Sequence, residues 1–288
     1  MASRRAAVVG TGLIGGSIGL ALRRRGWHVS GIDGSEAVAA RALELGALDV
    51  IGPDPAAEVT FVATPVQAIA GAALEVLGST RGIVTDVGSV KASVVEAVGH
   101  DRFLGGHPMA GSEQDGIDGA DPYLFAGAVW VLTPTAGTVD AAYPLVRSVV
   151  TDLGADVVAL DPAHHDALVA VVSHVPHLAA ASLMRLADER ATEHRALLRL
   201  AAGGFRDMTR IASGHPGIWP DICAENRTAI VEVLDGLVAA LTEVRGIVAG
   251  ADRQGLLALL EQARSARANL PTRLSGAGDL SEVRIPVP

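Results

Sequence analysis

The chain has 288 residues, of which 49% are apolar, and it carries a net charge of −9. A chain of this length can form two domains, and its acidic balance argues against a surface that binds nucleic acid or an anionic membrane. The single cysteine, Cys223, permits no internal disulfide, and no signal peptide precedes the first strand-like segment, so we expect a soluble cytoplasmic protein.

The first predicted element is a short apolar strand over residues 6–9, which passes through a glycine-rich turn into a helix-like run. The turn has the G-x-G-x-x-G pattern of dinucleotide-binding folds. In that pattern the glycines allow a tight turn, a close approach of backbone amides to a pyrophosphate, and packing of the helix on the strand. The phosphates would lie at the helix N-terminus. The expected cofactor contacts are Gly10, Gly12, Leu13, Ile14 and Gly15.

A second apolar run, residues 27–32, ends in Asp33, at about the distance from the glycines where an acidic residue binds ribose hydroxyls. Residues 34–36 supply no arginine for a 2′-phosphate, so we expect NAD rather than NADP. A plain glycine-rich turn is the alternative in a chain with 33 glycines. The order strand, turn, helix, strand and acidic residue favours the cofactor site.

Strand-like and helix-like runs alternate as far as about residue 160, mostly as short continuous apolar segments. Such segments are typical of a sheet that is covered by helices on both faces. The predicted strands are residues 6–9, 28–32, 59–63, 82–85, 103–105, 128–132 and 156–159. We therefore expect residues 1–160 to form a Rossmann-type, doubly wound α/β domain that binds its ligands outside the carboxyl ends of the strands.

Chemically distinctive residues follow three of these strands. His107 lies in a predicted loop after the fifth strand, and an imidazole is the usual general base for a hydroxyl proton. Ser89 has the equivalent position one strand earlier, where its hydroxyl could orient a substrate hydroxyl and the imidazole. Lys91 could hold the cofactor or the loop, or could be a solvated charge. The cofactor candidates in these loops are Thr64, Pro65, Asp86 and Ser89.

The pattern changes at Asp161-Pro162, a good N-cap followed by a proline suited to the first helical turn. Residues 162–189, 196–202, 220–249 and 253–268 then carry apolar side chains at helical spacing. We expect an all-α domain over residues 161–274 and an extended tail over 275–288. Residues 228–248 are apolar around most of the helix, so they must be buried within the domain or against a second subunit. We favour a homodimer through the helical domain.

Two polar clusters interrupt the helical half. Pro176 should kink its helix between His174 and His177, which share a face. No carboxylate or cysteine at a matching distance completes a metal ligand set, so substrate or cofactor contact is favoured over metal binding. Further along, Arg206 and Arg210 share a helical face and suit a carboxylate, with a surface ion-pair network as the alternative. Trp219 could supply an aromatic wall or simply pack in the core.

Six segments together resemble the prephenate dehydrogenase family of tyrosine biosynthesis over about residues 6–270: GTGLIGGSIGLAL, ATPV, DVGSVK, GHPMAGSE, SHVPHL and GFRDMTRIASGHPGIWPDICAEN. The resemblance implies that His107 is the catalytic histidine and Ser89 the serine that assists it. It implies that His177 is an active-site histidine and that Arg210 binds a carboxylate of prephenate. Further substrate-binding candidates are His174, Arg206, Trp219 and Ser112.

The resemblance also implies a helical dimerisation domain and an NAD-dependent reaction. That reaction is the oxidative decarboxylation of prephenate to 4-hydroxyphenylpyruvate, with NADH and carbon dioxide as the other products. One departure from the family pattern is visible. The family often has Ser-Asp-Pro before the tryptophan, whereas this chain has Ser213-Gly214-His215-Pro216. The shape of the substrate pocket and the role of His215 therefore stay open.

Three alternatives remain at this point. Arogenate would undergo the same chemistry, and the motifs do not separate it from prephenate. A 3-hydroxyacid dehydrogenase shares the layout but normally has a catalytic lysine on the first long helix after the sheet, where residues 164–168 offer none. A non-catalytic NADH-sensing module would leave His107, Ser89 and Arg210 without a purpose.

Overall fold

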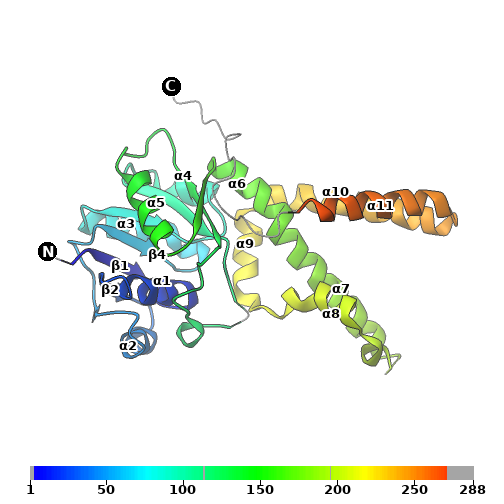
Figure 1. The fold of residues 1–288 in the computed structure, drawn as a ribbon, viewed down its shortest axis with the longest axis horizontal. Helices are drawn as coiled ribbons and strands as arrows, with labels where there is room; N and C mark the ends of the chain where they lie inside the picture. Colours follow the sequence, from blue (N-terminus) through cyan, green and yellow to red (C-terminus); the bar gives the residue numbers. More distant parts are fainter. Residues whose placement is uncertain (1–2, 113, 195, 271–288) are drawn as a thin grey trace.

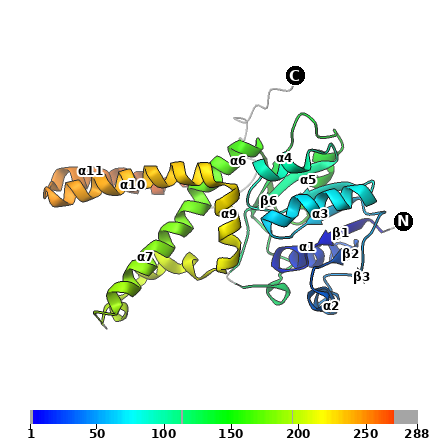
Figure 2. The same ribbon diagram turned by 180° about the vertical axis from the view of Figure 1, so that it is seen from behind.

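The computed structural model describes residues 3–112, 114–194 and 196–270. A domain built on a β-sheet occupies one end of the molecule, and the helices that follow it project away from that domain as two arms (Figures 1 and 2). Within the described residues strands end at Ala159, and every later element is helical. The predicted α/β domain followed by an all-α domain is therefore confirmed. The predicted tail over 275–288, together with the end of the helical domain at 274, lies outside the described residues.

Eight strands form one sheet in the order β3-β2-β1-β4-β5-β6-β7-β8. Their bounds are Arg5–Val9 (β1), His28–Ile32 (β2), Val50–Ile51 (β3), Val59–Val62 (β4), Ile83–Asp86 (β5), Phe103–Pro108 (β6), Val129–Thr133 (β7) and Asp156–Ala159 (β8). The sequence pattern did not predict β3, which has only two residues, both exposed. Strands β1 to β6 run parallel, as expected, but β7 pairs antiparallel with β6.

Strand β6 is longer than predicted, and this places His107 inside the sheet rather than in a loop. The strand continues through Gly106, His107 and Pro108, and His107 pairs with Val131 of β7. Glycine has a low strand propensity, so Gly105-Gly106 indicated the end of the strand. The structure requires glycine here, since a Cβ on Gly105 would lie 2.3 Å from Oγ1 of Thr133, on the neighbouring strand.

Alternate strand residues pack against helices on opposite faces of the sheet. Phe61 and Leu104 belong to the core shared with α1 (Leu13–Arg23), α2 (Glu36–Glu44) and α5 (Ala142–Asp152). Val62 and Phe103 belong to the core shared with α3 (Val66–Ser79) and α4 (Ala92–Val98). The continuous apolar strands are thus explained by helices on both faces, and the loops at the carboxyl ends of β1 and β4 to β6 are left to form a site.

A single long helical rod begins the second domain. Asp161 caps it by accepting hydrogen bonds from the amides of Ala163 and His164. The rod consists of α6 (Pro162–Val169), a π-helical turn (Ala170–His174) and α7 (Val175–Ala191). Pro176 cannot donate a backbone hydrogen bond, and the helix widens into the π turn just before it. The irregularity predicted at Pro176 is therefore a π turn, and His174 at its end is buried.

Two of the remaining predicted helices differ from the structure, whereas the one over 253–268 matches α11 (Arg253–Ala268). Residues 196–202 form only the short 3-10 turn Leu197–Leu200, followed by α8 (Gly203–Thr209) and the 3-10 turns Arg210–Ser213 and Pro216–Ile218. The predicted helix over 220–249 is divided at Asn226 into α9 (Trp219–Glu225) and α10 (Arg227–Ala249). Asn226 turns inward to bond the backbone carbonyl of Asp166, which explains the break.

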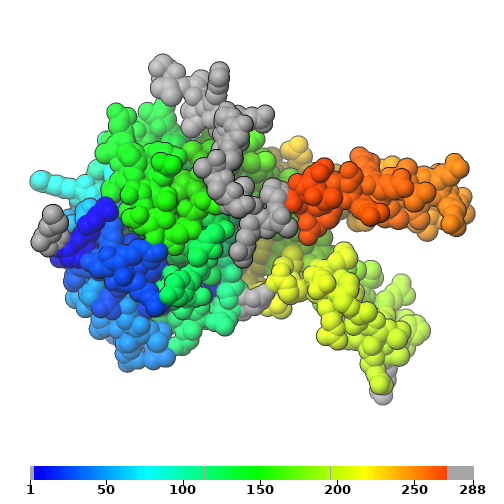
Figure 3. Space-filling view, viewed as in Figure 1, coloured from blue at the N-terminus to red at the C-terminus, as the bar shows by residue number. Residues whose placement is uncertain are grey.

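Helices α10 and α11 (Arg253–Ala268) pack as a hairpin that extends away from the sheet domain, apart from the arm formed by α7 and α8 (Figure 3). Only Ile230 of α10 is buried within the chain. Val238 and Leu241 are 61% and 58% exposed. Val233, Leu234 and Leu237 are half-buried, so its own chain covers only part of the apolar circumference of α10.

The rod Pro162–Ala191 is long and apolar enough to cross a membrane by length and composition, with a mean hydropathy of 1.6. Its first half nevertheless carries three buried polar side chains, His165, Asp166 and His174, that are hydrogen bonded inside the protein. We therefore interpret the rod as the structural link between the two domains.

Candidate active site

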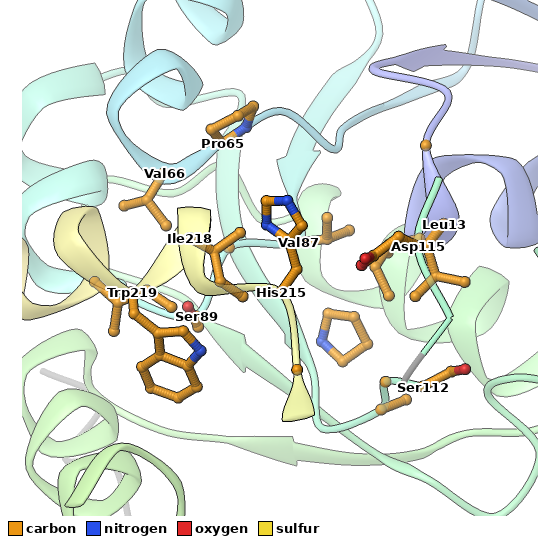
Figure 4. A pocket seen from close by; sticks show the side chains of 18 of the residues that line it. Leu13, Pro65, Val66, Val87, Ser89, Ser112, Asp115, His215, Ile218 and Trp219 are labelled. Atoms are coloured by element: carbon orange, nitrogen blue, oxygen red, sulfur yellow. The ribbon is translucent and has the colours of Figure 1, made fainter. Parts of the chain in front are cut away.

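One cavity of about 610 Å³ lies between the carboxyl ends of the strands and the helices α7 and α9. In Figure 4, Ser89 and Trp219 lie on one side of it and Leu13 and Asp115 on the other, with His215 between them. The predicted site residues that line the cavity are Gly12, Leu13, Ile14, Thr64, Pro65, Ser89, His107, Ser112, His177, Arg210 and Trp219. The fold therefore brings the glycine turn, the strand-end loops and the helical domain to one place.

The turn between β1 and α1 has the geometry that a dinucleotide requires. Gly10 has φ +87°, and a Cβ there would lie 2.6 Å from the carbonyl oxygen of Ala63. A Cβ on Gly15 would lie 1.9 Å from the Gly10 oxygen, whereas Gly12 has open space in front of it. Gly10 and Gly15 thus shape the turn without lining the cavity, and Gly12 with the start of α1 presents unpaired amides to an anion. These residues fit NAD.

Asp33 stiffens this turn instead of lining the cavity. Its Oδ2 accepts hydrogen bonds from the amide of Thr11 at 2.7 Å and from its hydroxyl at 3.2 Å. Its Oδ1 accepts from the amide of Ser35. The carboxylate is half-buried at the end of β2, directly beside the glycine turn, which is where a ribose would lie in a fold of this type.

Asp86 was expected to contact the cofactor, but the structure places it outside the cavity. It is fully buried, forms an ion pair with the equally buried Lys91, and accepts hydrogen bonds from the amides of Gly88 and Gly106. Asp86 therefore ties the ends of β5 and β6 together and does not line the cavity. Lys91 is likewise a buried structural cation rather than a solvated one, although burial lowers its pKa.

His107 is connected to two residues, His165 and Asp166, for which the sequence pattern predicted no role. Its Nδ1 lies 2.8 Å from Nε2 of His165, and Nδ1 of His165 lies 2.8 Å from Oδ1 of Asp166. His165 and Asp166 are buried in α6, whereas His107 is 8% exposed and reaches the cavity. The ring nitrogen of His107 that remains for a ligand is therefore Nε2.

The surroundings of His107 keep it neutral. Burial lowers its pKa well below 6.5, and the nearby His165, Lys91 and His174 lower it further because each disfavours a second positive charge. A general base must be unprotonated to act, so a lowered pKa keeps His107 ready near neutral pH. Ser89 lines the same cavity from the loop that follows β5.

The helical domain supplies the opposite wall. The rings of His177 and Trp219 are stacked, with centroids 3.6 Å apart and planes 12° apart. Arg210 also lines the cavity, whereas Arg206 is exposed and donates to the carbonyl of Ala201. His174 does not line the cavity: it is buried, its Nδ1 bonds Asn226, and burial lowers its pKa to about 4. Arg206 and His174 were expected to contact substrate, and the structure places both outside the cavity.

Several further residues line the cavity without having been predicted to do so, among them the carboxylates Asp115 and Asp221 and the exposed imidazole His215. Nδ1 of His215 accepts a hydrogen bond from the amide of Gly217.

One signal could have drawn attention to His165 and Asp166: they are ionisable residues near the start of a helix that is apolar over most of its length. No group of three metal-ligating side chains occurs among the residues that the structure describes.

Comparison with known proteins gives a consistent result for both domains. The nucleotide-binding domain model of prephenate dehydrogenase matches residues 18–159, and the dimerization domain model of prephenate dehydrogenase matches residues 161–262. A prephenate dehydrogenase of Bacillus subtilis is 36% identical, over 94% of this chain and 77% of the relative. A cyclohexadienyl dehydrogenase of Zymomonas mobilis is 33% identical, over 92% of this chain and 96% of the relative.

Solved structures agree. The crystal structure of prephenate dehydrogenase from Aquifex aeolicus in complex with hydroxyphenyl propionate and NAD⁺ has a TM-score of 0.85 and 29% identity, covering 94% of this chain and 99% of that one. Arogenate dehydrogenase of Synechocystis has a TM-score of 0.78 and 32% identity, covering 92% and 99%. The family resemblance of the sequence motifs is thereby confirmed. Because family models match both domains and the cavity between them is lined by His107, the chain belongs to the prephenate dehydrogenase family.

Proposed function

We propose that the protein catalyses the NAD-dependent oxidative decarboxylation of prephenate to 4-hydroxyphenylpyruvate. The observation that carries the proposal is the position of His107, a neutral imidazole at the end of β6 in a cavity that also contains the glycine turn and Arg210. A base at this point can reach a substrate that lies against the cofactor site. An arginine on the far wall suits one of the two carboxylates of prephenate.

The chain's own residues then have distinct tasks. When bound, NAD accepts a hydride from the ring carbon that carries the hydroxyl group. His107 takes the hydroxyl proton at Nε2, and Ser89, which lines the same cavity, is positioned to orient that hydroxyl. Carbon dioxide then leaves, and its bonding electron pair makes the ring aromatic. His107 returns the proton to the phenolate oxygen, so the histidine ends neutral and no proton is gained or lost overall.

Arogenate is the second candidate substrate, and one observation favours it. Arogenate carries an ammonium group where prephenate has a keto oxygen, and the carboxylates Asp115 and Asp221 line the cavity. Either carboxylate could pair with that ammonium, whereas prephenate would leave both without a cationic partner from the substrate. Relatives of the chain include proteins named for each substrate.

The test is to offer prephenate and arogenate, each with NAD and with NADP, to the purified protein and to follow reduced nicotinamide by absorbance. We expect the highest kcat/KM with prephenate and NAD. A preference for arogenate would assign Asp115 or Asp221 to the substrate ammonium. Failure to reduce NAD with either substrate, while NAD still binds, would favour a cofactor-sensing module and refute the proposal.

We also propose that the functional unit is a cytoplasmic homodimer that needs neither a membrane nor nucleic acid. The support is the uncovered apolar surface of α10 and α11 together with the match to a dimerization domain. A second copy is the natural cover for this surface, because soluble monomers rarely expose apolar patches of such extent.

A further inference from the structure

We propose that His165 and Asp166 are positioning residues that fix which nitrogen of His107 carries the proton, and that they share the positive charge when His107 acts as the base. This inference rests on the proposed function of His107. It starts from the two buried contacts that join the three side chains in a line, His107 to His165 and His165 to Asp166, each 2.8 Å long.

Asp166 is the fixed end of the line. Its Oδ1 accepts a hydrogen bond from the backbone amide of Lys91, and its Oδ2 accepts one from the amide of Ala92, both at 2.8 Å. Backbone amides can only donate, so the carboxylate must be an acceptor, and an ionised carboxylate has no proton to give. The third partner on Asp166, Nδ1 of His165, must therefore carry a hydrogen.

The direction of the next bond follows from this. A neutral imidazole has one N–H group, so His165 with its proton on Nδ1 presents a lone pair at Nε2. That lone pair faces Nδ1 of His107, which must donate. His107 is then left with a lone pair at Nε2, the nitrogen that remains for the cavity. The three residues thus select the one tautomer of His107 that can accept a hydroxyl proton from a substrate.

The charges around His107, His165 and Asp166 favour the transfer of positive charge from His107 toward Asp166. Lys91 is paired with Asp86, yet Lys91 and His174 both disfavour a positive charge on His107. Asp166 is the remaining buried carboxylate beside the histidines within the described residues. When His107 takes a proton at Nε2, the N–H bond at its Nδ1 can break as one forms at Nε2 of His165, which places the positive charge next to Asp166. The return of the proton to the product oxygen reverses both transfers.

A purely structural role is the competing explanation, since Asp166 also anchors the start of α4. Substitution of Asp166 would disturb that anchor, so the test uses His165. His165→Leu removes the acceptor for Nδ1 of His107. His165→Gln keeps an acceptor there, because its amide oxygen can replace Nε2. His164→Leu is the matched control, as His164 is the exposed neighbour on the same helix.

For His165→Leu we expect kcat to fall by about 100- to 1,000-fold, the lower part of the range for proton transfer by a positioned base, with KM and NAD affinity nearly unchanged. His165→Gln should recover most of the lost turnover, and His164→Leu should match the parent. Parent-like kcat in a folded His165→Leu protein would overturn the proposal. So would a His165→Gln protein that is folded, binds NAD and is as slow as His165→Leu.

A second measurement does not depend on activity and is made on the parent protein. Nitrogen-15 NMR of the histidine rings in the NAD-bound parent protein reports which ring nitrogen carries hydrogen, and His107→Asn identifies the signal of His107. We expect the Nδ1–H form for both His107 and His165. An Nε2–H form of His107 would refute the positioning role even if prephenate is turned over. The expected tautomers in a protein that turns over neither substrate would instead overturn only the proposed function.

Discussion

Replacing His107 by asparagine tests the assignment of the base most directly. Asparagine keeps a polar side chain beside Nε2 of His165 but cannot accept and hold a proton. Loss of a positioned general base costs about 10²–10⁴-fold in turnover, so we expect kcat to fall within that range. NAD binding should change little, because the glycine turn that would bind the phosphates belongs to β1 and α1.

The pH dependence gives the second part of this prediction. An ordinary histidine is half protonated near pH 6.5, whereas the pKa of His107 lies well below that value because the ring is buried beside His165, Lys91 and His174. Protonation removes the base, so kcat/KM of the parent should stay level from pH 8 down to about 6.5 and fall tenfold per pH unit only below the lowered pKa. The asparagine variant should lack this limb.

The assay is NADH absorbance across pH 5–8 at varied prephenate concentration, with circular dichroism at each pH. The spectra are necessary because His174, whose pKa is lowered to about 4, takes up a proton more readily in the unfolded chain. Stability therefore declines as pH falls below about 6.5. A parent profile that is half lost at pH 6.5 or above, in folded protein, would refute the argument from burial. Retention of the acid limb by His107→Asn would refute the assignment of the base.

Four further predictions follow from individual contacts. Arg210→Ala should raise KM for prephenate about 10- to 100-fold with kcat nearly unchanged, the loss expected for a charge-assisted hydrogen bond, and unchanged KM would exclude the carboxylate contact. NAD should give a higher kcat/KM than NADP, and Asp33→Ser should reduce the ratio of the two kcat/KM values. Equal kcat/KM values with NAD and NADP in the parent would refute the contact of Asp33 with the ribose. Light scattering should report a dimer at micromolar concentration and a monomer for Val238→Glu combined with Leu241→Glu, and a monomeric parent would contradict the proposed interface. Lys91→Met should lower the free energy of unfolding by about 3–5 kcal/mol in urea titration, because Asp86 is left as a buried charge, and addition of Asp86→Asn should recover part of that loss.

Much of the scaffold could be predicted because it depends on short-range patterns. The turn of Gly10 to Gly15, the cap at Asp161 and the apolar strands each follow from neighbouring residues and periodicity. The predicted cavity residues from Gly12 to Ser112 lie at or just beyond the carboxyl ends of strands, which a parallel sheet must bring to one edge. Family motifs supplied their expected roles, which composition alone could not have done.

The errors share one physical cause, the long-range contact. Gly106 and His107 were predicted in a loop because their pairing with β7 is not visible in the sequence. Asp86 was predicted as a cofactor contact, but Lys91 and the amide of Gly106 enclose it. The tautomer of His107 is determined by His165, which is 58 residues away in sequence. Sequence by itself determined the elements and the chemistry available to this protein. Tertiary structure alone decided which side chains meet, because burial makes each polar group take whatever partner the fold brings within hydrogen-bond distance.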